Sequence, residues 1–141
     1  MIYTPLTKKA IRLIFKAHEG QFDKSGLPYV THPLHVAEQV EGEYETCVAL
    51  LHDVIEDCGY SADDLRAAGF PGEVVEAVEL LTHAEGVPYL DYVRAIKPNA
   101  LARAVKIADL RHNSDLSRLD EVTDAARARV AVYAEALALL E

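Results

Sequence analysis

Residues 46–57, TCVALLHDVIED, form the stretch of sequence that decides the fold. Every residue from Cys47 to Leu51 is apolar, and Val54 and Ile55 continue the apolar run beyond His52 and Asp53. A helix that is apolar on nearly every side belongs in the interior of a helical domain. We therefore expect a central buried helix over residues 46–57, with the other helices packed around it.

The segments before and after residues 46–57 are also predicted to form helices. Thr4 followed by Pro5 is typical of a helix start, and the apolar spacing that follows predicts a helix ending near Gly20. After a loop over residues 21–32, Pro33 is expected to open a helix that runs through Val40. Five more helices are expected, over residues 61–69, 71–81, 88–96, 98–113 and 123–140. The sequence thus predicts an all-α fold of seven or eight helices, in one domain spanning residues 1–141.

The central stretch carries four ionisable side chains that an interior helix would not normally contain. At about 100° per residue, Glu56 lies on the face of His52 and Asp57 lies one turn beyond Asp53. Three carboxylates in so small a sector repel one another unless a cation lies between them. Since no Lys or Arg occurs nearby in the sequence, a divalent metal explains the group better than a salt bridge does. The alternatives are a structural His–Asp pair and a solvated rim.

A second anomalous set follows in the apolar segment that ends near residue 113. Lys106, Asp109 and Asn113 recur at spacings of three and four residues and so share one helix face. One further histidine would complete a mixed shell of imidazole and carboxylate ligands, which suits Mn, Fe or Zn. His32, placed before Pro33, is the best candidate. The remaining histidines, at positions 18, 35, 83 and 112, have weaker claims.

Charge is distributed unevenly along this chain of 141 residues. The net charge is −9, and residues 25–65 contain nine acidic residues but no Lys or Arg. An acidic chain is a poor candidate for binding nucleic acid or anionic membranes, and no apolar run is long enough to span a membrane. Cys47 and Cys58 form neither a CxxC motif nor a disulfide framework, so we expect reduced thiols and a cytoplasmic protein.

Four blocks of sequence together resemble the HD superfamily of metal-dependent phosphohydrolases. More narrowly, they resemble the hydrolase domain of the RelA/SpoT alarmone enzymes and the stand-alone small alarmone hydrolases. The blocks occur in the family's order and extend over roughly residues 10–120. They are AHEGQ (17–21), SGLPYVTHP (25–33), ALLHDVIED (49–57) and VKIADLRHN (105–113).

The resemblance implies an HD helical bundle around a metal site and a role for each matched residue. His32, His52, Asp53 and Asp109 match the metal ligands, usually for Mn²⁺, with Fe, Zn or Mg as alternatives. Glu56 and Asp57 match the acidic pair that handles the attacking water. Lys24, Ser25 and Asn113 match positions that contact the nucleotide. Lys106 and Arg111 are further candidates for substrate counter-charges, although Lys106 could equally be a surface lysine.

The implied reaction is the removal of pyrophosphate from the 3′ position of guanosine tetra- or pentaphosphate, which leaves GDP or GTP. One departure concerns Asp23, which stands where the family commonly has a basic residue and is expected to weaken the hold on guanine. Two alternatives therefore remain: hydrolysis of another nucleotide phosphate, such as NADPH or a 5′-nucleotide, and a nucleotide-sensing module without turnover. The partner expected in each case is a small nucleotide. The apolar stripe of the last helix leaves a homo-oligomer open.

Overall fold

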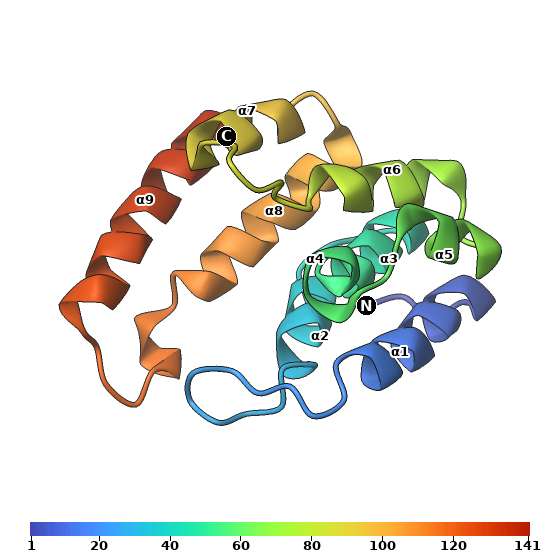
Figure 1. The fold of residues 1–141 in the computed structure, drawn as a ribbon, viewed down its shortest axis with the longest axis horizontal. Coiled ribbons are helices and arrows are strands. Elements are labelled where there is room, and N and C mark those ends of the chain that lie inside the picture. The colour runs from blue at the N-terminus through green and yellow to red at the C-terminus, as the bar shows by residue number, and fades with distance from the viewer.

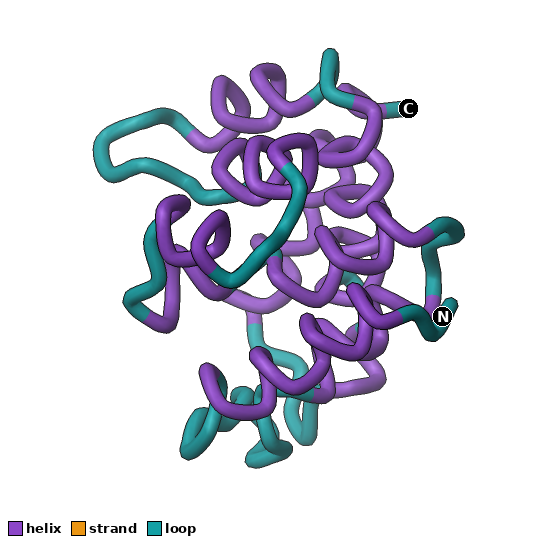
Figure 2. Tube along the Cα trace, turned by 90° about the vertical axis from the view of Figure 1, so that its right-hand side faces the viewer, coloured by secondary structure: helices purple, strands orange, loops and turns teal.

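The computed structural model describes residues 1–141 and consists of helices joined by short loops (Figures 1 and 2). Its only β-type pairing is an isolated bridge between Phe22 and Pro28. The predicted all-α fold is confirmed. The elements are α1 (Pro5–Ala17), α2 (Thr31–Glu38), α3 (Glu43–Leu51), α4 (Val54–Cys58), α5 (Ala62–Ala67), α6 (Gly72–Leu80), α7 (Tyr89–Ile96), α8 (Ala100–Asn113), the 3₁₀ turn η1 (Leu116–Arg118) and α9 (Asp124–Leu140).

Several helices begin where side-chain caps are available. The Thr4 and Thr7 side chains form a reciprocal capping box at the start of α1, with Pro5 in the first turn. Asn99 caps α8 by accepting from the N–H of Ala102, and Thr123 caps α9 by accepting from that of Ala126. These caps satisfy backbone donors that have no partner inside a helix.

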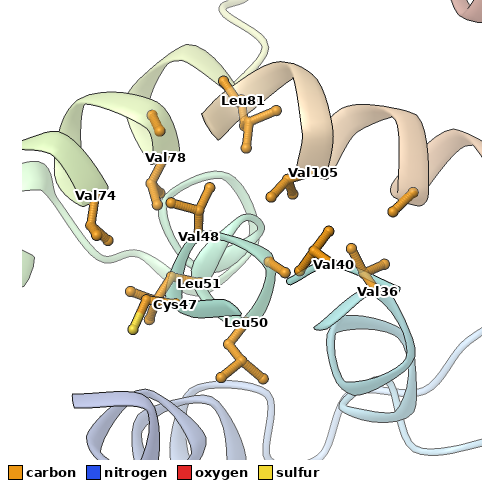
Figure 3. Packing of buried hydrophobic residues seen from close by; sticks show 14 of the residues in the cluster. Val36, Val40, Cys47, Val48, Leu50, Leu51, Val74, Val78, Leu81 and Val105 are labelled. Atoms are coloured by element: carbon orange, nitrogen blue, oxygen red, sulfur yellow. The ribbon is translucent and has the colours of Figure 1, made fainter. Parts of the chain in front are cut away.

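Helix α3 is the centre of the packing. It contacts α1, α2, α6 and α8, and Figure 1 shows these four helices around it. Every residue from Thr46 to Leu51 is buried. In Figure 3, Val48 points into the space between Val78 of α6 and Val105 of α8, while Leu50 points toward α1. The expectation of a central buried helix is therefore confirmed for its first half.

The second half of that expectation is wrong, because the helix is interrupted at His52 and Asp53. Residues 46–57 are divided between α3 and α4, and the backbone at Asp53 has φ −104° and ψ −2°. In a continuous helix the carbonyl of Ala49 would accept from the N–H of Asp53. Here the Nδ1 of His52 lies 2.6 Å from that carbonyl oxygen and competes for it. The interruption places His52 and Asp53 at a junction between two helices.

Several other boundaries differ from the sequence prediction, among them the start of α3, which lies at Glu43 and not at residue 46. Helix α1 ends at Ala17, and Gly20 adopts φ 77° in the turn that follows. Helix α2 begins at Thr31, so His32 lies inside the first turn and not in the preceding loop. Pro33 fits there because the N–H groups of a first turn have no partner within the helix. Even the longest helix, α9, lacks the combination of length and apolarity that a membrane crossing requires, as do all the others.

Candidate metal centre and nucleotide cavity

Four side chains from three separate segments converge at the end of α3. His32 comes from α2, His52 and Asp53 from the junction of α3 and α4, and Asp109 from α8. The Nε2 of His32 lies 2.8 Å from Oδ1 of Asp109 and 3.9 Å from Oδ2 of Asp53. The Nε2 of His52 lies 3.1 Å from Oδ2 of Asp53 and 3.5 Å from Oδ1 of Asp109. The structure thus brings together all four residues expected to bind a metal.

The donor set fits a divalent cation. The Nε2 of His52 is buried and has no hydrogen-bond partner, although two carboxylate oxygens lie close to it. When the ring is neutral and donates Nδ1–H to the carbonyl of Ala49, its Nε2 presents a lone pair to the cluster. Two imidazole nitrogens and two carboxylate oxygens at one point are ligands typical of first-row divalent metals.

The electrostatics of the cluster favour positive charge at the same point. Burial by itself would raise the pKa of Asp53, but the neighbouring His52 outweighs it and lowers that pKa to about 2. Burial alone would lower the pKa of His52, yet Asp53 and Asp109 hold it well above its ordinary value. Burial would also raise the pKa of Asp109, but the nearby Lys106 outweighs it and holds that pKa well below its ordinary value. Both carboxylates are therefore ionised and attract a cation.

Lys106 lies on the far side of Asp109 from the histidines and does not line the cavity described below. Its Nζ is 2.9 Å from Oδ2 of Asp109 and lies over the rings of Tyr89 and Tyr92, at 5.8 and 5.2 Å from their centroids. Burial opposes the charge of Lys106, but Asp109 outweighs burial and raises the lysine pKa. The side chain expected to contact substrate therefore neutralises and orients Asp109 instead.

The acidic pair of α4 lies at the exposed rim of the cluster. Asp53, Glu56 and Asp57 each offer a carboxylate oxygen, and these oxygens all lie within 4.8 Å of one another. Burial, followed by the charges of Asp53 and Glu56, raises the pKa of Asp57. The Oε1 of Glu56 accepts a hydrogen bond of 2.7 Å from the backbone N–H of His83.

A cavity of about 310 Å³ opens beside this cluster. Lys24, Ser25 and Asn113, three of the five residues expected to contact substrate, line it together with His32. Asn113 also donates from Nδ2 to Oδ1 of Asp109 over 3.0 Å. His32 belongs to the cluster and Asn113 contacts Asp109, so the cavity adjoins the cluster.

The other residues that line the cavity include apolar and basic side chains. Leu116, Leu119 and Val130 supply apolar surface, and Arg118 and Arg129 supply positive charge. This mixture suits a ligand with a flat base and attached phosphates. The other expected counter-charge, Arg111, does not line the cavity, because its guanidinium pairs with Glu141 at 2.9 Å on the surface.

Asp23 stabilises the loop between α1 and α2, a role that the sequence analysis did not predict. Its Oδ1 accepts from the N–H groups of Ser25 and Leu27, both at 2.9 Å, and its Oδ2 lies 3.9 Å from Arg118. The Ser25 hydroxyl donates to the carbonyl of Arg118 over 2.8 Å, which joins two segments 93 residues apart. Figure 1 shows this blue loop beside the orange segment after α8. The carboxylate of Asp23 thus shapes the loop, and Arg118 supplies a positive charge beside it.

Two further residues contact the cluster: Tyr29, which the sequence analysis did not single out, and His112, which it gave only a weaker claim to bind the metal. The Tyr29 hydroxyl donates to Oδ2 of Asp53 over 2.6 Å, and its pKa is raised mainly by burial and then by Asp53. The Nδ1 of His112 lies 2.7 Å from the Nδ1 of His32. Both residues lie inside the sequence blocks that resemble the family, and that position could have marked them as candidates. Their contacts could not be predicted, because they depend on how the helices pack.

Comparisons with known proteins point to one group. The chain is 37% identical over 112 residues to a guanosine-3′,5′-bis(diphosphate) 3′-pyrophosphohydrolase of Haemophilus influenzae, and 35% identical over 112 residues to the bifunctional (p)ppGpp synthase/hydrolase SpoT of Escherichia coli K12. Each match covers 69% of this chain but only 16% of the relative. No family model matches.

The fold has a solved counterpart. A structure described as a metazoan ortholog of SpoT that hydrolyses ppGpp superposes with a TM-score of 0.80 at 24% sequence identity. The match covers 100% of this chain and 88% of the other. The two proteins therefore share their fold over essentially the whole chain.

Proposed function

We propose, starting from the relationship of this chain to the RelA/SpoT proteins, that it hydrolyses guanosine tetra- and pentaphosphate. The reaction would remove pyrophosphate from the 3′ position and release GDP or GTP. One observation carries the proposal: the cluster of His32, His52, Asp53 and Asp109 adjoins a cavity whose walls suit a nucleotide.

The cluster would hold the divalent metal. Two histidines and two aspartates suit Mn²⁺, and they match the family's Mn²⁺ ligands, with Fe, Zn and Mg as the alternatives to test. When bound, such an ion lowers the pKa of a coordinated water and offsets charge on phosphoryl oxygens. Lys106 would stay with Asp109, keeping its Oδ1 directed at the cluster while Oδ2 is paired.

Glu56 and Asp57 would orient the attacking water and accept its proton. The raised pKa of Asp57 makes its carboxylate a stronger base than an ordinary aspartate. Glu56 is held at Oε1 by the N–H of His83, which leaves Oε2 to orient the water. Tyr29, donating to Oδ2 of Asp53, would keep that carboxylate from rotating.

The cavity would bind the rest of the nucleotide. Lys24 and Arg118 offer positive charge for the phosphates, and Ser25 fixes the loop that carries Lys24. The apolar surface of Leu116, Leu119 and Val130 would face the base. The net negative charge of the chain does not oppose binding of a phosphorylated nucleotide. The acidic residues at the cluster would attract the metal, and the metal would attract the phosphates.

The test is a panel of nucleotides incubated with protein loaded with Mn²⁺. Release of pyrophosphate with GDP from guanosine tetraphosphate, and its absence with Asp53→Ala, is the expected result. Turnover of NADPH or a 5′-nucleotide instead would replace the proposed substrate. Tight binding of guanosine tetraphosphate without release of pyrophosphate would replace the enzyme with a sensing module.

A further inference from the structure

The two histidines of the cluster are supported at their outer nitrogens in different ways. The Nδ1 of His52 can donate only to a backbone oxygen, that of Ala49, at 2.6 Å. A carbonyl oxygen only accepts, so this contact determines where the His52 proton lies. The Nδ1 of His32 instead meets another imidazole nitrogen, the Nδ1 of His112, at 2.7 Å. Either ring can be the donor there.

The direction of that hydrogen bond decides whether His32 can bind a metal. If His112 donates, neutral His32 carries its proton on Nε2 and donates it to Oδ1 of Asp109, 2.8 Å away. If His32 donates from Nδ1, its Nε2 has a lone pair directed at the cluster. A metal ligand requires the second arrangement, in which His112 is the acceptor.

His112 is firmly held in the position that this task needs. Its ring is nearly coplanar with that of His32, with centroids 5.0 Å apart and planes at 7°, and it stacks on the ring of His35, at 3.8 Å and 16°. Its backbone carbonyl accepts from Nη1 of Arg118 over 2.9 Å. His35 and His112 also line a second, smaller cavity of about 190 Å³. That cavity gives the ring of His112 access to water for exchanging a proton.

We propose that His112 is a positioning residue of the metal centre, which accepts the Nδ1 proton of His32 and so selects its metal-binding tautomer. The change balances without net charge on the two rings. The proton on Nε2 of His32 is lost, the shared proton passes from His112 to Nδ1 of His32, and Nε2 of His112 takes up one proton from water. The inference rests on the metal site of the proposed function and is independent of the substrate.

The experiment compares two substitutions at position 112. His112→Phe keeps a ring between His32 and His35 but removes the acceptor, whereas His112→Asn keeps an acceptor near the position of Nδ1. Titration calorimetry with Mn²⁺ or Zn²⁺, without nucleotide, should show about a 10–100-fold weaker affinity for His112→Phe. His112→Asn should recover most of that loss. His35→Phe is the matched control, since it preserves stacking and leaves the contact with His32 intact, and its affinity should match wild type.

A second readout uses the unmodified protein, so it does not depend on how any variant folds. Long-range ¹⁵N–¹H correlations of the His32 ring should show the proton on Nδ1 once Zn²⁺ is bound. Wild-type metal affinity in His112→Phe would overturn the proposal, as would a proton on Nε2 of His32 in the loaded protein. Because neither measurement involves turnover, a failure of the proposed substrate would leave these results unchanged.

Discussion

His52 has one ring nitrogen satisfied by the carbonyl of Ala49 and the other buried without a partner. A divalent cation beside Nε2 would supply the partner that this nitrogen lacks. Removing one member of a buried charged group typically costs about 3–5 kcal/mol, because the remaining charge loses its compensation. The imidazole of His52 is only 4% exposed, so solvent does little to reduce that cost.

We expect His52→Ala and Asp53→Ala to lose both the bound metal and the activity, and to unfold at lower denaturant concentrations. Metal content by atomic absorption, alongside chemical denaturation, checks both statements. A variant that retains one equivalent of metal would remove its residue from the site. His83→Ala, which leaves the backbone N–H that binds Glu56 in place, is a suitable comparison for the loss of an imidazole.

Glu56→Gln separates catalysis from metal binding. The amide oxygen can still accept from the N–H of His83, so the local structure should persist. The loss of the carboxylate should lower kcat by about 100-fold or more if Glu56 handles the proton of the attacking water. Steady-state kinetics and metal content should be measured on one preparation. Loss of metal would instead make Glu56 a ligand.

At the scale of elements, the loop between α1 and α2 and the turn η1 form one wall of the cavity beside the metal cluster. They are joined through Ser25 and Arg118, and Asp23 sets the shape of the loop. The backbone contacts of Asp23 resemble a cap, in which one carboxylate satisfies two N–H groups. The cavity therefore depends on two segments that are distant in sequence.

Asp23→Ala should loosen this wall and raise KM more than it lowers kcat, since the metal cluster is untouched. Losing the two hydrogen bonds should also cost about 1–3 kcal/mol of stability. Asp120→Ala, which removes the same charge from an exposed side chain, is the control. An unchanged KM would mean that the loop holds its shape without Asp23.

At the scale of the whole molecule, the cluster joins α2, α8 and the junction of α3 and α4. A ligand that binds only where these helices meet stabilises the folded state as a whole. A free metal concentration of 100 times the Kd raises the free energy of unfolding by about 2.7 kcal/mol. For a chain of this size that increase raises the Tm by about 5–10 °C.

Chelation with EDTA should therefore lower the Tm of the loaded protein by that amount, and restoring Mn²⁺ should reverse the change. His52→Ala should show no difference between the two conditions. Calorimetry or circular dichroism measures both. An equal shift in the variant would indicate that the stabilising metal binds elsewhere.

The features that were predicted correctly from the sequence depend on residues that are close together in the chain. The helix starts at Thr4 and Thr123 follow from residue types within a few positions of each start. The burial of residues 46–51 follows from an unbroken apolar run. The interruption at His52 could not be predicted in the same way, because the pattern is apolar on both sides and only the side-chain contact with Ala49 marks the break.

The sequence by itself determined the helical class, the main helix starts and the candidate residues, since all of these depend on short-range spacing and residue chemistry. Tertiary structure decided which candidates meet. His32 reaches Asp109 across 77 residues and His112 across 80, whereas Lys106 turns to Asp109 and Arg111 turns to Glu141. The physical reason is that a side chain's partner depends on which helix faces pack together, and the local pattern of one helix does not contain that information.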